Sequence, residues 1–212
     1  MTILITAGPT REAIDPVRYL TNRSSGKMGY ALAEAAARKG HRVILISGPT
    51  TIEVPDGIDF IPVESAADMH QAVKHWIGKA QVALFAAAVA DYRPARVEEQ
   101  KIKKTGDTLT LELVRTPDIL GSARAEFGFT GYLVGFAAET EKVEENALAK
   151  LERKGCDLVI ANDVSRSDIG FDSRENEVTL LFRDRVMPLE KASKEHLGHE
   201  IIAILEEESQ LS

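Results

Sequence analysis

The sequence contains almost no cysteine. Cys156 is the only one in 212 residues, so an intramolecular disulfide is excluded, and so is a metal site built from several cysteines. Because Cys156 follows Gly155 and begins an apolar stretch, we expect a buried structural thiol rather than a nucleophile. Histidine is scarce as well. His196 and His199 fit one face of a helix, but a zinc site needs a third or fourth ligand, so we predict no metal site built by the protein.

Long apolar runs and a surplus of positive charge are also absent. No segment is long enough to cross a bilayer, and the N-terminus opens on a predicted strand rather than a signal peptide, so we expect a cytoplasmic protein. The formal net charge of -7 gives no general attraction to nucleic acid or to an anionic membrane, and we predict neither partner. With 44% hydrophobic and 28% charged residues, the chain is long enough for one well-buried α/β domain.

Three common nucleotide-binding or catalytic motifs are missing. The first loop, TAGPTRE, lacks the second and third glycines of the dinucleotide fingerprint, which argues against a short-chain oxidoreductase. Gly26 and Lys27 are followed by Met28 rather than by serine or threonine, so this is not a Walker A loop. The nucleophile elbow GxSxG does not occur, and no histidine stands near a candidate nucleophile. These absences favour chemistry in which bound substrates attack one another.

The stretch from residue 3 to residue 27 carries the strongest functional signal. Ile3 to Ile5 form an apolar run typical of a buried strand. Helical periodicity begins only near Tyr30, about twenty residues later, whereas such connections usually take about two to six residues. Four basic residues in this loop stand against two acidic ones: Arg11, Arg18, Arg23 and Lys27 against Glu12 and Asp15. We therefore expect the loop to bind an anion.

Ser24, Ser25 and Gly26 stand directly before the predicted helix. A serine hydroxyl at the helix cap, followed by glycine, would leave the first backbone N–H groups free to hold phosphate oxygens. The alternative is ordinary capping of a solvated loop, and these residues alone leave it open.

A second basic loop, DYRPARVEEQKIKK at residues 91–104, has five positive charges against three negative ones. Lys101 and Lys103 would point to one side of an extended segment, although alternation alone fits a solvated strand equally well. Thr105 to Asp107 resemble a turn into the alternating stretch 108–114. We therefore predict a hairpin over 101–114.

The remaining pattern alternates apolar strands with amphipathic helices. It predicts an α/β fold: a Rossmann-like, doubly wound, mostly parallel sheet with helices on both faces, in a single domain over residues 1–212. Polar residues that follow the strands would then meet at one ligand-binding edge. Further strands are predicted at 42–47, 60–63, 82–90, 132–139 and 157–162. Helices are predicted to start after Gly26, at Ser65, at Thr116 and Pro117, after Glu139 and near Leu197.

Two antiparallel segments, 101–114 and 176–189, do not fit the parallel sheet by pattern. We predict that they form a protruding arm with one apolar face. A second copy of the chain would cover that face in a homodimer.

Several segments, in order, carry a family resemblance: TAGPTREAIDPVRYLTNRSSGKMG, AAVADYRP followed by KIKK, VRTPDIL, GFAAET and ANDVSRSDIGFDSREN. They resemble the phosphopantothenoylcysteine synthetase family, the second half of the bacterial coenzyme A biosynthetic flavoprotein. The resemblance implies a CTP-dependent ligase that joins 4′-phosphopantothenate to L-cysteine through an acyl-cytidylate, giving CMP and pyrophosphate. It also implies Mg2+ bridging the nucleotide phosphates, a homodimer, and a flavin-dependent decarboxylase that is fused or separate.

The same resemblance implies the site residues. Asn22, Lys101 and Arg18 would be catalytic, and Asn22, Arg18 and Ala88 would contact the acid substrate. Asp91 suits a metal or the nucleotide, and the nucleotide is favoured because this residue follows the base-binding strand. The resemblance implies nucleotide contacts from Gly8, Ser24, Ser25, Gly26, Phe85, Ala86, Ala87, Asp91, Lys101, Pro117, Asp118, Ile119, Leu120, Phe136, Lys150 and Lys154.

A non-enzymatic alternative is a nucleotide-sensing module whose arm mediates assembly.

Overall fold

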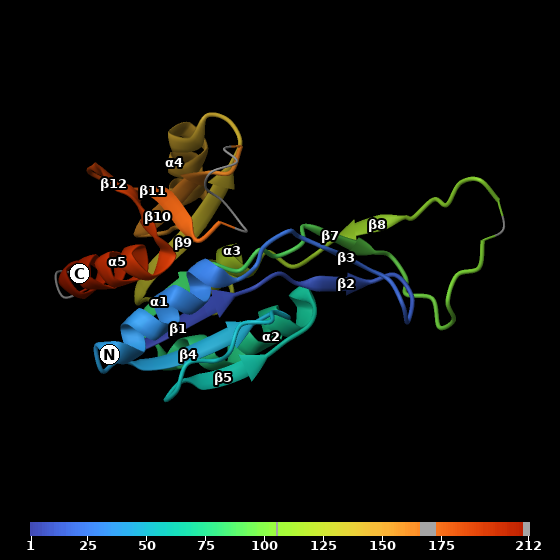
Figure 1. Cartoon of the computed structure of the whole chain (residues 1–212), viewed down its shortest axis with the longest axis horizontal. Coiled ribbons are helices and arrows are strands. Elements are labelled where there is room, and N and C mark those ends of the chain that lie inside the picture. The colour runs from blue at the N-terminus through green and yellow to red at the C-terminus, as the bar shows by residue number, and fades with distance from the viewer. Residues whose placement is uncertain (105, 166–172, 210–212) are drawn as a thin grey trace.

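The body of the molecule is an eight-stranded sheet (Figure 1). The computed structural model describes residues 1–104, 106–165 and 173–209. The strands lie in the order β12-β11-β10-β9-β6-β1-β4-β5, with parallel pairing except at β10–β11 and β11–β12. This confirms the predicted Rossmann-like, mostly parallel sheet. The strand bounds are β1 Thr2–Ala7, β4 Arg42–Ser47, β5 Asp59–Pro62, β6 Val82–Phe85, β9 Tyr132–Glu139, β10 Leu158–Asp163, β11 Glu175–Phe182 and β12 Val186–Ser193.

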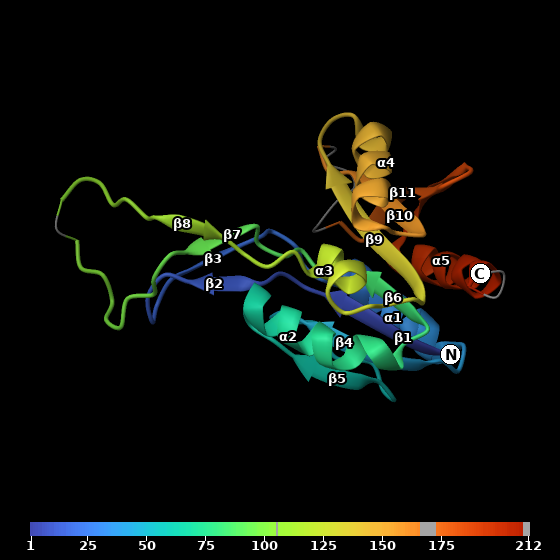
Figure 2. The ribbon, with the colours of Figure 1, turned by 180° about the vertical axis from the view of Figure 1, so that it is seen from behind.

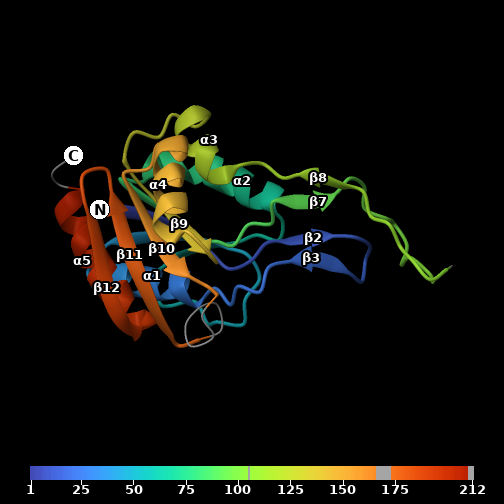
Figure 3. The same cartoon turned by 90° about the horizontal axis from the view of Figure 1, so that it is seen from above.

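Helices cover both faces of this sheet (Figure 3). One face carries α1 (Lys27–Arg38) and α5 (Lys194–Glu208). The other carries α2 (Ala66–Trp76), its continuation η1 (Ile77–Lys79), α3 (Ile119–Ala125) and α4 (Val143–Lys154). Because both faces are covered, the central strands are apolar on both sides, and burying each large aliphatic side chain contributes about 1.5–3 kcal/mol. Within the described ranges, no helix combines the length and apolarity needed to cross a membrane.

The prediction that residues 176–189 belong to a protruding arm is wrong. β11 pairs antiparallel with β10, and β12 pairs antiparallel with β11, so this hairpin extends the main sheet. The side chains of β11 are buried on both faces, with Leu180 in the core under α1 and α5 and Leu181 in the opposite core. Two reversals give β12 the same direction as β10. The chain therefore enters α5 at the ligand-binding edge of the sheet.

Element boundaries near this edge also differ from the predicted ones. β6 ends at Phe85 rather than at residue 90, because the following backbone bonds to the loop after β1. α1 is capped by Gly26, which has a φ of 80°, rather than by a serine hydroxyl. α3 is capped by Asp118, whose side chain accepts a first-turn N–H. The Thr116 hydroxyl, predicted as that cap, donates instead to the Ala90 carbonyl at 2.6 Å.

An arm projects from the body (Figures 1 and 2). It contains two short antiparallel pairs, β2 (Arg11–Ala13) with β3 (Tyr19–Thr21) and β7 (Tyr92–Pro94) with β8 (Leu113–Arg115). The predicted hairpin over 101–114 is wrong in register, because the pairing joins residues 92–94 to residues 113–115. Residues 101–104 and 106–112 form no strand. Large apolar side chains of the arm are exposed, namely Val17, Tyr19, Tyr92, Val97, Leu109 and Leu113.

Helices α1 and α5 meet through a glycine. A Cβ on Gly198 would lie 2.9 Å from the backbone oxygen of Ala31, a contact that would push the two helices apart. We expect Gly198→Ala to lower the free energy of unfolding by about 1–3 kcal/mol, as overpacking does, and denaturant titration measures it. The matched control is Gly78→Ala, whose added Cβ meets no atom of the described residues within 4 Å. An equal loss in both variants would contradict the close-packing explanation.

Candidate functional site

Two adjoining pockets open at the carboxyl edge of the sheet. The first has a volume of about 510 Å³ and is lined by β1, β6, β9, the loop after β6, residues 115–120 and α4. The second, of about 340 Å³, is lined by Asn22, residues 24–29, the same loop, and residues of β9, β10, β11 and α5. The two pockets form one cleft, because they share the lining residues Ala87, Val89, Asp91, Phe136 and Lys150.

Hydrogen bonds between two loops build the floor of this cleft. The Ala88 N–H donates to the Gly8 carbonyl at 2.9 Å, and the Ala88 carbonyl accepts from the Thr10 N–H at 3.3 Å. The Thr10 hydroxyl also accepts from the Ala90 N–H at 3.0 Å. Gly8 has a φ of 71°, which a residue with a side chain would adopt only with strain. Gly8 contributes its backbone carbonyl to the floor but lines neither pocket.

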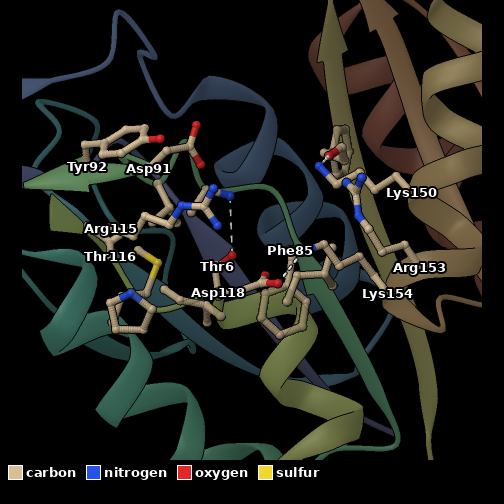
Figure 4. A pocket seen from close by; sticks show the side chains of 17 residues that line it. Thr6, Phe85, Asp91, Tyr92, Arg115, Thr116, Asp118, Lys150, Arg153 and Lys154 are labelled. Atoms are coloured by element: carbon tan, nitrogen blue, oxygen red, sulfur yellow. Dashed lines mark hydrogen bonds and ion pairs between the residues drawn. The ribbon is translucent and has the colours of Figure 1, made fainter.

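Basic side chains dominate the first pocket (Figure 4). Burial would raise the pKa of Asp118, but the contact with the Lys154 ammonium and a helix N–H outweigh it and lower the pKa. Burial lowers the pKa of Lys150, whose ammonium donates to the Phe136 carbonyl. The first pocket therefore suits an anionic ligand. Among the described residues that line it, the charged ones are Arg115, Lys150, Arg153 and Lys154 against Asp91 and Asp118.

The second pocket is built around the start of α1. Gly26 caps this helix and offers no side chain to accept its first-turn N–H groups. A Cβ on Gly29 would lie 2.6 Å from the Cβ of Ala7, so only glycine lets the helix start directly against the end of β1. The Asn22 amide donates to the Ala88 carbonyl at 2.8 Å, which fixes its side chain beside the shared loop. A helix start of this kind favours phosphate binding.

Most of the predicted site residues meet in this cleft. Three of them, Gly8, Arg18 and Lys101, line neither pocket. The first pocket contains Phe85, Ala87, Asp91, Pro117, Asp118, Ile119, Leu120, Phe136, Lys150 and Lys154. The second contains Asn22, Ser24, Ser25, Gly26, Ala86 and Ala88, together with the shared residues.

Arg18 and the segment that carries Lys101 are joined on the arm instead. The Arg18 guanidinium binds the Asp15 carboxylate and donates to the Ile102 carbonyl at 3.0 Å. Asp15 also accepts from the Ile102 N–H at 3.1 Å. The Arg18 contact is the main reason that the pKa of Asp15 lies well below its usual range, despite burial. Within one copy of the chain, these two cations are therefore not part of the cleft that holds Asn22.

Several polar residues of the cleft are absent from the predicted set: Arg115, Arg153, Asn162, Asn176 and Lys194. The sequence contained a usable signal for Asn162, because it ends the predicted strand 157–162 and lies next to the last residue of β10, at the edge where ligand-binding residues gather. Asn176 could not be placed there while residues 176–189 were assigned to the arm, and Lys194, the first residue of α5, is positioned by the strand that leads into it. Arg115 belongs to the quoted segment VRTPDIL but was not singled out within it, and Arg153 belongs to none of the quoted segments.

Residues 1–208 match the family model described as the DNA/pantothenate metabolism flavoprotein C-terminal domain. The chain belongs to this flavoprotein family. This confirms the resemblance found in the sequence.

The relatives of the chain within this flavoprotein family are about twice its length. The chain is 49% identical over 208 residues to the coenzyme A biosynthesis bifunctional protein CoaBC of Vibrio cholerae serotype O1, covering 97% of this chain and 52% of that protein. The chain is 50% identical over 207 residues to CoaBC of Bacillus subtilis (strain 168), and the match covers 94% of this chain and 50% of that protein. The chain thus spans about half the length of the curated relatives it matches. The crystal structure of the C-terminal domain of CoaBC superposes with a TM-score of 0.85 at 42% identity, covering 100% of this chain and 96% of that one.

Cys156 is fully buried, as expected, and burial raises the pKa of its thiol to about 11. Because the thiolate is the reactive form, we expect an alkylating reagent near neutral pH to modify the native protein far more slowly than the unfolded chain. Mass spectrometry over time, with and without urea, measures the two rates. Equal rates would contradict both the burial and the structural assignment of this thiol.

Proposed function

We propose that the chain is a cytoplasmic, CTP-dependent ligase of coenzyme A biosynthesis that joins 4′-phosphopantothenate to L-cysteine. The observation that carries this proposal is one basic cleft at the carboxyl edge of the sheet, in a chain that is acidic overall and belongs to the pantothenate flavoprotein family. The products would be 4′-phosphopantothenoylcysteine, CMP and pyrophosphate.

The first chemical step brings two anions together. The carboxylate of phosphopantothenate bonds to the α-phosphorus of CTP, and the bond from that phosphorus to the pyrophosphate oxygen breaks. In the second step the cysteine amine attacks the acyl carbon of the acyl-cytidylate, loses a proton and displaces CMP. Negative charge develops in both steps, so cations and N–H donors that are already in place lower the barriers. The cleft supplies both kinds of group.

The two pockets suit different parts of the nucleotide. Residues 117–120 and Phe136 line the first pocket beside Lys150 and Lys154, which suits the nucleoside. The start of α1 lines the second, which suits the phosphates. Asn22 lines the second pocket next to the loop that both share, a position that suits handling of the acyl-cytidylate.

Magnesium fits this cleft as an ion carried by the nucleotide. The described residues contain no group of three or more His, Cys, Asp or Glu side chains that could hold a metal ion. Mg2+ commonly binds through substrate phosphates and water, with one or two carboxylates. Asp91 borders both pockets, so it would contact the nucleotide and supply the carboxylate when the ion is bound. The ion would neutralise part of the phosphate charge.

Lys101 and Arg18 would act in the cleft of a second copy. Both belong to the arm, which projects away from the body of its own chain (Figure 2). The exposed apolar side chains of the arm support burial against another molecule. A two-fold homodimer in which each arm crosses to the partner would cover these side chains and bring Lys101 to the reacting carboxylate.

A flavin-dependent decarboxylase is the proposed functional partner, either fused to this chain or separate. The relatives that support it are named as bifunctional and are about twice as long as this chain. Such a partner would consume the product of the ligase reaction.

The reaction itself is the first test. We expect the protein to release pyrophosphate when 4′-phosphopantothenate, cysteine and CTP are supplied together, and to release less with ATP. A coupled pyrophosphate assay measures both, and reactions without the acid substrate are the control. If neither nucleotide yields pyrophosphate, the ligase proposal fails and a sensing module that binds without turnover is favoured.

A subunit-mixing experiment tests whether Lys101 acts on the partner. Lys101→Gln removes a cation from the first step and Asn22→Asp impairs use of the acyl-cytidylate, so each variant alone is expected to lose most activity. If Lys101 works on the partner, a mixed dimer has one intact site, and a 1:1 mixture recovers about a quarter of wild-type activity.

The matched control replaces Lys101→Gln by Lys104→Gln, a neighbouring exposed lysine whose loss should leave the activity of that copy intact. Differently tagged copies, co-expressed and purified through both tags, isolate the mixed dimers. Purified mixed dimers that remain inactive would place Lys101 in its own cleft, and a Lys101→Gln protein that keeps full activity on its own would place Lys101 outside the reaction.

A further inference from the structure

The lining of the second pocket includes two buried polar side chains that the proposed reaction does not use. Asn176 and Lys194 are each only 4% exposed, and both line this pocket. They come from β11 and from the first residue of α5, elements at the opposite end of the chain from the first loop. Their presence in the cleft needs a physical explanation.

The fold places these two residues beside each other. In the β11–β12 ladder, Asn176 pairs with Ala192 and Glu175 pairs with Ser193, which caps α5. The Lys194 N–H donates to the Arg174 carbonyl at 3.0 Å and continues this ladder into the helix. The same hairpin that extends the sheet therefore presents Asn176 and Lys194 at the carboxyl edge.

Two helix N-termini meet at this pocket. Ala31 of α1 packs against Gly198 of α5, and each lies four residues beyond the first residue of its helix, Lys27 or Lys194. Both first residues line the pocket, and Figure 3 shows the two helices side by side on one face of the sheet. Helix N-termini carry partial positive charge. The charged residues among the described lining are Lys27, Lys150 and Lys194 against Asp91, so the pocket attracts anions.

Asn176 supplies an independent indication of a ligand. Its side-chain oxygen is buried and has no hydrogen-bond partner within the described part of the chain. Buried polar atoms are almost always paired, because leaving one unpaired destabilises the fold. A ligand that brings a donor to this oxygen removes the penalty. That donor is an O–H group of the ligand or a water molecule that the ligand holds.

A phosphate group meets both requirements. Its anionic oxygens accept from helix N–H groups and from an ammonium, and its hydroxyl or a bound water donates to the Asn176 oxygen. We propose that Asn176 and Lys194 form a subsite for a phosphate group of a substrate. The source of that phosphate rests on the proposed function: it is either the terminal phosphates of CTP or the phosphomonoester of 4′-phosphopantothenate.

Binding of matched ligand pairs tests this subsite. Titration calorimetry at fixed ionic strength gives the affinities of the wild type and of Lys194→Met for CTP against CMP, and for 4′-phosphopantothenate against pantothenate. We expect Lys194→Met to weaken one phosphorylated ligand about tenfold to a hundredfold and to leave its counterpart unchanged. If Lys194→Met weakens binding of CTP alone, the subsite holds the nucleotide phosphates. If it weakens binding of 4′-phosphopantothenate alone, the subsite holds the phosphomonoester.

The control variant is Lys191→Met, an exposed lysine three residues earlier that lies outside the pocket. Inorganic pyrophosphate serves as a further probe, because its binding does not depend on turnover. Loss of pyrophosphate binding in Lys194→Met would therefore support the subsite even if the chain formed no ligation product. If neither ligand pair nor pyrophosphate responds beyond the control, the proposal is wrong.

Asn176→Leu separates a ligand contact from a structural role. This change removes the unpaired oxygen, so the melting temperature should stay equal or rise while affinity for the phosphorylated ligand falls. A lower melting temperature with equal weakening of all four ligands would assign Asn176 to folding and overturn its part in the subsite. If Lys194→Met does not fold, Lys194→Gln provides the same comparison with a neutral polar side chain.

Discussion

The bonds between the loop after β1 and the loop after β6 are the interaction on which the site depends. Neither loop has regular structure around Ala88, yet each satisfies the backbone of the other through Gly8 and Thr10. Ala86, Ala87 and Ala88 line the second pocket, so their small side chains leave the backbone of this loop open to a ligand. Both pockets share this floor, and Asn22 is fixed to it. The geometry of the cleft is therefore set largely by backbone.

Electrostatics complements this scaffold. The chain carries a formal net charge of -7, yet basic side chains prevail in both pockets. In the first pocket part of that charge is already neutralised by pairing, as between Lys154 and Asp118. In the second the start of α1 adds N–H donors that need no counter-ion. The reaction that we propose joins two anions, and a local surplus of positive charge would serve it where the acidic chain as a whole gives no long-range attraction.

The sequence was sufficient to predict the sheet and most residues of the cleft. Apolar runs such as Ile3 to Ile5 indicate buried strands, and the polar residues that follow them indicate the ligand-binding edge of the sheet. The sequence was insufficient for the hairpin of β11 and β12. The sequence of an alternating antiparallel pair fits a protruding arm as well as an extension of the sheet. The burial of Leu180 on one face of the sheet and of Leu181 on the other shows that the pair extends the sheet. The positions of Asn176 and Lys194 follow from this extension. The hairpin predicted over 101–114 was wrong for a related reason, because alternation within one segment does not identify the strand with which it pairs.

Asp15 links two segments of the arm that are far apart in the sequence. Its carboxylate binds the Arg18 guanidinium and the Ile102 backbone N–H at once, and the Arg18 contact lowers the pKa of this carboxyl, which favours the ionised form. Asp15 therefore ties the β2–β3 hairpin to the backbone beside Lys101. In the proposed dimer, this link would keep the positive charges of Arg18 and Lys101 close together where the arm meets the partner's cleft.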